Sequence, residues 1–512
     1  MSIASYRVRP SGGQYHRIVL PTAALRVFCW RAVTNESSPS AWKPSKMTDD
    51  QAKTRTTGLP DALLDRIKSP LAKVLRIEAA GGAVLLVSTV IALAISNSSL
   101  ANAYESLWET QVGVHFGSYH FGRSLRAWIN DGLVTVFFFL VALELKRELV
   151  LGELNRPRVA ALSICAALGG MIVPAVIYLG LLFGQPGEQG WGTVMATDTA
   201  FVIGCLALLG DRIPQSVRAF MLSLAIVDDI GAILVVAIGY SRDIVWWPLV
   251  FAALGLGVIR ALSVTGFRGF PIYALMGGLV WIAVDATGIH PTVAGVILGL
   301  MTPARRWVSD ERLYAILGQV VAHPASREDN LGTKDRETLQ MAEVAARETL
   351  SPVERLVIAL HPWVGFVIMP IFALSNAGLV MTFDHFDHPV TLAVFVGFAA
   401  GKPAGIMMFS WLAVRLRIAI RPAELTWRLL AGGSLLAGIG FTMALLIAHM
   451  AFGEHLLESA KQGIFLASIF SAVSGLAFLA WSSGDPSDGR ALAGEHRQHE
   501  IPPERKRVVR RP

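Results

Sequence analysis

Residues 221–236, MLSLAIVDDIGAILVV, place two adjacent carboxylates, Asp228 and Asp229, in the middle of an apolar run. A run of this length and composition predicts a helix that crosses a lipid bilayer. An ionised side chain at mid-bilayer costs roughly 2.5–3.5 kcal/mol on insertion scales, so such residues are rare and mark functional sites by default. The pair therefore indicates both a membrane protein and the location of its site.

The rest of the chain supports a membrane-embedded fold. Of its 512 residues, 53% are hydrophobic and 16% are charged, whereas soluble domains carry about 25% charged residues. The composition predicts an all-α polytopic protein with about twelve transmembrane helices. The predicted spans lie near residues 78–96, 125–145, 159–182, 190–209, 218–240, 246–263, 271–286, 290–303, 356–379, 390–412, 428–448 and 463–482.

Positive charge alternates between successive loops. The loop after the second span is basic, 183–190 has no Lys or Arg, 304–355 is rich in Arg, and 381–389 again has neither. The positive-inside rule then predicts a bacterial inner-membrane protein with both termini in the cytoplasm. Basic loops beside a membrane also account for the net charge of +7 better than nucleic-acid binding does.

The two ends differ from the predicted transmembrane domain, residues 76–482. Residues 1–75 are predicted to form a cytoplasmic, largely disordered segment, in which 1–46 hold seven Lys or Arg and one acidic residue. We favour Met47 as the true start, with 1–46 untranslated; a transit peptide is the alternative. Residues 483–512 are polar and basic, and predict a disordered cytoplasmic tail.

One loop is predicted to contain strands. Residues 111–123 alternate apolar and polar side chains on both sides of Gly117-Ser118, a two-residue turn sequence. This pattern favours a β-hairpin, and the loop-charge pattern puts it on the extracytoplasmic side.

The adjacent carboxylates suggest exchange chemistry. Two negative charges so close together repel, which favours a protonated form of one of them. A carboxylate that gives up a proton and then binds a cation is what an ion exchanger requires, so we expect Na+ and H+ to bind at Asp228 and Asp229. Lys402, in VGFAAGKPAGIMMFSW, is the natural counter-charge; a purely structural salt bridge is the alternative.

Two predicted spans look interrupted. The fourth contains Thr197-Asp198-Thr199 in mid-run, and the eleventh contains AGIGFTM, where glycine and threonine weaken a helix. Interrupted helices leave partial charges at their inner ends. Asp198 is expected to offset the positive ends and Lys402 the negative ones. The residues of the second interruption are Gly438, Gly440 and Thr442.

Other polar residues in or near the predicted spans have competing explanations. Asp131 lies near the outer end of the second span, where a helix-capping or packing role is the alternative to a functional one. Glu144 and Glu148 lie at its cytoplasmic end beside basic residues, so a solvated helix end is a fair alternative to a role in transport. His290 precedes Pro291 at a helix start, and an ordinary cap-region histidine explains it well.

Several motifs, in order along the chain, resemble one family. The segments are WINDGLVTVFFFLVALELKREL, ALGGMIVPAVIYL, ATDTAFVIGCLALLGDRIP, LAIVDDIGAI, HPTVAGVILGL, LHPWVGFVIMPIFALSNAG, AAGKPAGI and AGIGFTM. They look like the signature segments of NhaA-type sodium/proton antiporters, and the match runs from about residue 76 to 482.

The resemblance implies twelve helices with inverted repeats and two crossed discontinuous helices, the fourth and the eleventh. NhaA is one of the proteins from which the link between paired interrupted helices and a transport site was drawn. The resemblance also implies electrogenic exchange of Na+ or Li+ for H+, without a cofactor. It assigns ion binding to Asp228 and Asp229, pH control to Glu144 and Glu148, and homodimer contacts to the hairpin at 111–123.

The sequence departs from the family pattern in two places. Well-studied members carry a glutamate and a histidine before the HPW motif, where this chain has Val357 and Ile358. The loop at 304–355 is also longer than usual. Both differences concern the pH response and leave the transport residues in place.

Two other classes of protein are less consistent with these patterns. An intramembrane aspartyl protease also uses two membrane aspartates, but on separate helices with separate motifs. A passive channel needs neither a titratable pair nor a buried lysine. The sequence therefore favours a secondary transporter over an enzyme or a channel.

Overall fold

The computed structural model describes residues 3–8, 16–21, 78–116, 119–151, 157–240, 244–265, 270–304, 340, 343, 350–379 and 388–482. Most of the predicted N-terminal segment, most of the loop at 304–355 and the predicted tail at 483–512 lie outside these residues. The predictions for those segments therefore stay predictions.

The chain divides into two compact units, residues 1–67 and 68–512. In the first unit the structure describes two strands, β1 (Ile3–Val8) and β2 (His16–Pro21). They pair antiparallel in a register that joins Ile3 to Pro21 and Val8 to His16. These two strands were not predicted from the sequence.

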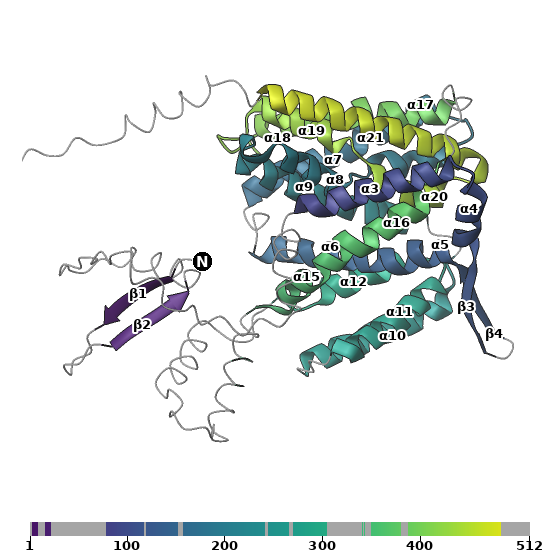
Figure 1. Ribbon diagram of the computed structural model, residues 1–512, viewed down its shortest axis with the longest axis horizontal. Helices are drawn as coiled ribbons and strands as arrows, with labels where there is room; N and C mark the ends of the chain where they lie inside the picture. The colour runs from purple at the N-terminus through teal and green to yellow at the C-terminus, as the bar shows by residue number, and fades with distance from the viewer. Residues whose placement is uncertain are drawn as a thin grey trace, which may run out of the picture. The chain divides into compact units, whose positions relative to one another are not determined.

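The second unit is almost entirely helical (Figure 1). Segments labelled η are 3-10 or π-helical. In chain order its elements are α3 (Glu78–Ser96), α4 (Ala101–Glu109), β3 (Gln111–Phe116), β4 (Tyr119–Ser124), α5 (Leu125–Ala127), η2 (Trp128–Leu133), α6 (Val134–Leu151), α7 (Pro157–Leu181), η4 (Glu188–Met195), α8 (Thr199–Leu208), η5 (Gly210–Arg212), α9 (Gln215–Gly239), α10 (Trp246–Val264), α11 (Phe270–Asp285), α12 (Thr292–Met301), α15 (Pro352–Trp363), η6 (Val364–Ile368), α16 (Met369–Asn376), α17 (Pro389–Val396), η8 (Gly397–Gly401), α18 (Lys402–Arg415), α19 (Trp427–Ala437), α20 (Phe441–Ala451) and α21 (Glu454–Ser482).

The predicted helical membrane fold is confirmed. Among the described residues, eight helices are long and apolar enough to cross a bilayer, or up to ten if two bent pairs each count as one span. The bent pairs are α3 with α4, at 115°, and α19 with α20, at 45°. Two shorter apolar helices, α11 and α12, match the two shortest predicted spans. The total of twelve spans stays a prediction.

Large apolar side chains on the outside of the second unit agree with a lipid environment. Phe183, Leu208 and Ile238 are 82%, 78% and 81% exposed. Contiguous exposed apolar surface is unfavourable in water and marks a membrane or partner surface. Because such residues occur on many helices of this unit, we attribute this exposure to contact with lipid.

Glycines allow the two most closely packed helices to meet. A Cβ atom added to Gly169 of α7 would lie 2.2 Å from the carbonyl oxygen of Gly405 of α18, and one added to Gly405 would lie 2.1 Å from that of Gly169. Gly401, just before α18, would likewise meet Pro174 of α7 at 2.9 Å. Small residues at a helix interface let the backbones approach in this way in membrane proteins.

Helices α10, α11 and α12 surround a second, smaller core, separate from the main one. Figure 1 shows α10 and α11 side by side. Helix α12 joins this group to the main core through α6, since a Cβ atom on Gly295 would lie 2.4 Å from the carbonyl oxygen of Thr135. Gly299 makes a similar approach to Phe139 and Ala142.

The segment predicted as a hairpin contains β3 and β4. They pair antiparallel, with Gln111 opposite Ser124 and Phe116 opposite Tyr119. Residues 117 and 118, the predicted turn, lie outside the described part of the chain.

The glycine contacts between α7 and α18 generate a stability prediction. We expect Gly169→Ala to lower the free energy of unfolding by about 1–3 kcal/mol, because the new methyl group forces two backbones apart. Thermal unfolding of the detergent-solubilised protein measures this change. Gly180→Ala is the matched control on the same helix, since nothing lies within 4 Å of its added Cβ. Equal melting temperatures for the two variants would contradict the packing argument.

Candidate functional site

The two predicted interruptions lie against each other. After η4 the chain is extended at residues 196–198 before α8 begins, and α19 ends just before residues 438–440, which precede α20. The backbone N–H of Asp198 donates to the carbonyl oxygen of Ile439 across 2.7 Å. Each break therefore supplies a hydrogen-bond partner for backbone that helical bonding leaves unsatisfied, as a membrane interior requires.

The glycines of the second interruption make this contact possible. A Cβ atom on Gly440 would lie 2.3 Å from the ring of Phe398 and 3.2 Å from the carbonyl oxygen of Ala196. One on Gly438 would lie 2.5 Å from the hydroxyl of Ser471 and 2.8 Å from the carbonyl oxygen of Phe398. Residues with side chains at these two positions would hold the breaks apart.

Asp198 serves the N-terminal ends of both half-helices. Its Oδ1 accepts from the backbone N–H of Phe201, 3.2 Å away, in the first turn of α8. Its Oδ2 accepts from the N–H and the hydroxyl of Thr442, at 2.9 and 2.5 Å, in the first turn of α20. A carboxylate is favourable at a helix N-terminus because unsatisfied N–H groups and the helix dipole both attract negative charge.

Lys402 is completely buried and lies at the opposite kind of helix end. Its Nζ donates to the carbonyl oxygen of Met195, the last residue of η4, and lies 3.3 Å from Oδ2 of Asp228. Nζ is also 5.9 Å from the ring centre of Phe398. A cation is favourable at a C-terminal helix end, where carbonyl oxygens are unsatisfied.

Asp228 and Asp229 lie in mid-α9 and are 1% and 4% exposed, so neither carboxylate is generally solvated. The hydroxyl of Thr197 donates to Oδ2 of Asp228 across 2.5 Å and lies 3.3 Å from the carbonyl oxygen of Ala437. Oδ1 of Asp228 is buried and accepts no hydrogen bond from the described residues. Asp229 instead faces Thr199, whose Oγ1 is 3.4 Å from its Oδ2.

The structure thus brings together five of the predicted site residues, Asp228, Asp229, Thr197, Asp198 and Lys402, with Thr442 and the two glycines. The sequence pattern placed Thr199 in the first interruption but indicated no contact for it or for the carbonyl group of Met195. Thr199 directly follows Asp198 and Met195 precedes it by three residues, but only the tertiary contacts show which group each one faces.

The predicted pH-response residues lie at the other end of α6 from Asp131. Glu144 has Oε1 3.7 Å from Nε2 of His361 on α15, and Glu148 has Oε1 3.5 Å from Arg147. On α15, Val357 is buried and Ile358 is 63% exposed. The departure from the family pattern therefore places one apolar residue inside the protein and one on its surface.

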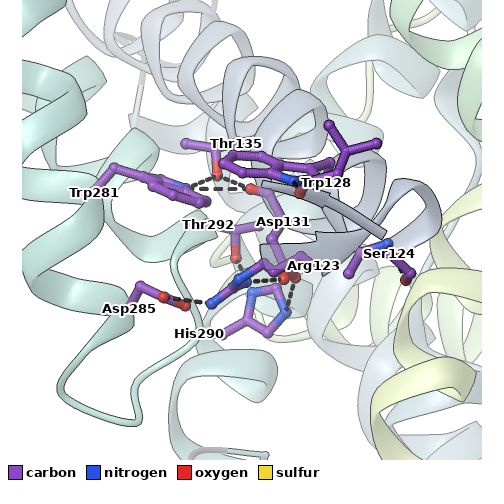
Figure 2. A network of polar contacts seen from close by, with 11 residues as sticks. Arg123, Ser124, Trp128, Asp131, Thr135, Trp281, Asp285, His290 and Thr292 are labelled. Carbon is purple, nitrogen blue, oxygen red and sulfur yellow. Dashed lines mark hydrogen bonds and ion pairs between the residues drawn. The ribbon is translucent and has the colours of Figure 1, made fainter. Parts of the chain in front are cut away.

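Asp131 and His290 belong to a separate polar network, shown in Figure 2. Arg123 of β4 donates to the carboxylates of Asp131 in η2 and Asp285 in α11. The imidazole of His290 lies 3.4 Å from Asp131 through Nε2 and 2.8 Å from the hydroxyl of Thr292 through Nδ1. This network ties the end of β4 to the group of α10, α11 and α12.

Trp281 of α11 strengthens the same junction. Its indole N–H lies 2.9 Å from the hydroxyl of Thr135 and 3.3 Å from the carbonyl oxygen of Asp131, and its ring stacks on that of Trp128 (Figure 2). Arg123 and Trp281 were not anticipated, because no spacing in the sequence connects residues 158 positions apart. The described contacts of Asp131 and His290 fit a junction between helices better than a place beside Asp228 and Asp229.

Comparison with known proteins identifies the family of the chain. The family described as Na+/H+ antiporter 1 matches residues 72–479. The chain belongs to this family. The resemblance predicted from the sequence motifs is therefore confirmed, and the family consists of transporters rather than enzymes.

Three relatives show the extent of the similarity. Na(+)/H(+) antiporter NhaA 3 of Acidiphilium cryptum (strain JF-5) is 54% identical over 454 residues, which cover 88% of this chain and 100% of that protein. Na(+)/H(+) antiporter NhaA of Rhizobium meliloti (strain 1021) is 56% identical over 417 residues, covering 81% and 95%. Na(+)/H(+) antiporter NhaA 2 of Vibrio vulnificus (strain CMCP6) is 51% identical over 425 residues, covering 83% and 95%.

The shared carboxylate of Asp198 generates a second prediction. We expect Asp198→Asn to lower the free energy of unfolding by about 1–3 kcal/mol, because an amide has one acceptor oxygen and cannot serve the first turns of both α8 and α20. Thermal unfolding in detergent measures the loss. Thr442→Ser, which keeps both donors to Asp198, is the matched control and should unfold close to the native temperature. A native melting temperature for Asp198→Asn would show that the shared acceptor does not stabilise the crossing.

Proposed function

We propose that this protein is an electrogenic secondary antiporter that exports Na+ or Li+ in exchange for H+, with Asp228 and Asp229 as the carrier pair. Membership of the Na+/H+ antiporter 1 family supports the exchange of these ions. The observation that carries the assignment of the site is the buried pair of adjacent carboxylates, placed beside Lys402 and the two helix breaks. Sodium or protons supply the positive charge that these groups lack, and no cofactor takes part.

Competition for one site couples the transport of Na+ to the transport of H+. Asp229 and Asp228 are too buried to keep two negative charges without compensation, because desolvation and mutual repulsion both oppose ionisation. Lys402 compensates one of the two charges. Na+ compensates the other while both carboxylates are ionised, whereas protons bind to the carboxylates themselves, so each ion excludes its competitor and the direction of exchange follows the two gradients.

The charges of the site support electrogenic exchange. With both carboxylates ionised and Lys402 charged, these three groups carry a net charge of −1. One Na+ brings the sum to zero, whereas two protons bring it to +1. A cycle that carries sodium one way and two protons the other way therefore moves net charge across the membrane, and the membrane potential drives it.

Asp198 and Lys402 also offset the helix ends that meet in mid-membrane. Asp198 lies at the N-terminal ends of α8 and α20, and Lys402 lies at the carbonyl end of η4. We assign them charge compensation in addition to the role of Lys402 beside Asp228. Without such groups, the partial charges of the interrupted helices would face an apolar interior.

The loops and strands support a proposal for the orientation of the protein in the membrane and for its oligomeric state. We propose that both termini lie in the cytoplasm, which the alternation of basic and basic-poor loops supports, and that the membrane is a bacterial inner membrane. Strands β3 and β4 then lie on the outer side, where unpaired strand edges are available for a second copy of the chain. We propose a homodimer that pairs through residues 111–123.

The first functional prediction concerns the exchange itself. We expect Asp229→Asn or Asp228→Asn to abolish sodium-driven proton movement, because an amide neither carries the exchangeable proton nor neutralises a cation. Dequenching of a pH-sensitive dye after sodium is added to inverted membrane vesicles measures the exchange.

Two controls make this experiment specific. Asp285→Asn removes a carboxylate from the network around Arg123, where Asp131 remains to pair with the arginine, and should retain exchange. The rate in vesicles with an imposed potassium diffusion potential tests electrogenicity. Normal exchange in Asp229→Asn would refute the assignment of the pair, and a rate indifferent to the potential would refute electrogenic transport.

The second functional prediction concerns the pH response. We expect Ile358→His to make the exchange rate depend more steeply on pH between 6 and 8. A histidine gains positive charge as the pH falls through about 6.5 and then repels cations near Glu144 and His361. Position 358 lies on the surface in the second turn of α15, so the substitution does not disturb the buried core.

Exchange is measured at fixed sodium from pH 6 to 9 in the native protein, in Ile358→His and in Ile358→Gln. The glutamine variant is polar but does not titrate, so it should follow the native profile. Val357→Glu/Ile358→His tests the two departures from the family pattern together. Superimposable profiles for the native protein and both histidine-containing variants would show that these positions do not set the pH response.

A further inference from the structure

Thr199 borders the carboxylate of Asp229, and the exchange proposed above assigns it no role. It is the first residue of α8 and directly follows Asp198, the cap of that helix. Its side chain is partly exposed, whereas Asp229 is 4% exposed. Its Oγ1 faces Oδ2 of Asp229 across 3.4 Å.

The separation of these two oxygens is informative. Hydroxyl hydrogen bonds to oxygen are usually about 2.5–3.0 Å long, as in the contact of 2.5 Å between Thr197 and Asp228. Oxygen ligands of a cation of the size of Na+ lie about 2.4 Å from the ion, as they do around Ca2+. Two such ligands at a right angle are then about 3.4 Å apart. The contact between Thr199 and Asp229 has this spacing, whereas the contact between Thr197 and Asp228 is too short to hold an ion between its oxygens.

We propose that Oγ1 of Thr199 is a neutral ligand for the sodium ion that Asp229 binds, which makes Thr199 a specificity-determining residue. The inference rests on the proposed function, because it names a further ligand of the same site. In the absence of sodium the hydroxyl donates weakly to Asp229; when sodium binds, the hydroxyl turns its proton away and offers a lone pair to the ion.

A neutral oxygen ligand at this position lets the site discriminate between sodium and protons. A proton needs one carboxylate oxygen, whereas a sodium ion needs several oxygen ligands to replace its water. The hydroxyl of Thr199 therefore adds to the affinity for sodium without adding a charge that also attracts protons. The charged groups that act on Asp229 are Asp228, Asp198, Glu144 and Lys402, and a change at Thr199 leaves all four in place.

The test replaces the hydroxyl with a methyl group of nearly equal volume. We expect Thr199→Val to raise the KM for sodium about tenfold, equivalent to the loss of about 1.4 kcal/mol of binding free energy. The maximal rate should stay within about twofold of native, because both carboxylates remain. Thr199→Ser restores the oxygen and should restore the KM. The control is Thr89→Val, which removes a buried hydroxyl bonded within α3 and should leave the KM unchanged.

Measuring KM from pH 7 to 9 separates a ligand from a group that only tunes protonation. If Thr199 ligates sodium, the rise in KM persists at pH 9, where few protons compete. A rise that vanishes at pH 9 would overturn the proposal, because the hydroxyl would then act on the proton alone. An unchanged KM in Thr199→Val would also overturn it.

A second measurement does not depend on turnover. Sodium that binds the folded protein raises its melting temperature in detergent. Thr199→Val and Thr199→Ala should each need about ten times more sodium than the native protein for the same rise, and an unchanged requirement in either variant that folds would overturn the proposal. Native exchange with an unaffected Thr199→Val refutes this inference alone, whereas a native protein without sodium-driven proton movement refutes the proposed function as well.

Discussion

A single carboxylate holds the centre of this molecule together. Asp198 accepts hydrogen bonds from the first turn of α8 and from the first turn of α20, two helices that are more than 240 residues apart in the chain at the point of contact. In lipid, water cannot satisfy the backbone groups that an interrupted helix exposes, so the protein has to do so. The carboxylate does this for both breaks at once, and the breaks meet beside Asp228, Asp229 and Lys402.

Small residues and charged residues depend on each other in this arrangement. Gly438 and Gly440 allow the breaks to approach, and the approach brings Asp198 within reach of Thr442. Gly169 and Gly405 bring α7 and α18 together, and α18 begins with Lys402. Close backbone contacts thus fix the positions of the buried charges, and the paired charges make it possible to bury them.

The positions of the helices could be predicted from the sequence because an apolar run is a local property. The predicted span at 78–96 coincides with α3, and the span at 246–263 differs from α10 by one residue. Helix α21 was less well predicted: it begins at residue 454 instead of 463, because Lys461 is buried through contacts with Glu458 and the carbonyl group of Gly378 that no apolar pattern reveals.

The members of the site could be predicted, but their pairing could not. Buried charges and broken helices are visible in the sequence, and they identified Asp198, Asp228, Asp229 and Lys402. Thr197 and Thr199 are two residues apart and chemically identical, yet one contacts Asp228 and the other Asp229. That difference arises from the turn of the chain at Asp198, which directs the two side chains to different carboxylates of α9, and only three-dimensional coordinates contain it.

The contact between α7 and α18 has a mechanical consequence. With Gly169 and Gly405 packed backbone to backbone, and Gly401 against Pro174, neither helix can slide along the other without steric overlap. We therefore expect the two helices to move together as a rigid pair that carries Lys402. Any rearrangement that opens the ion site to the opposite side of the membrane must either carry the lysine and both helices together or leave all three at rest while α9 moves against them.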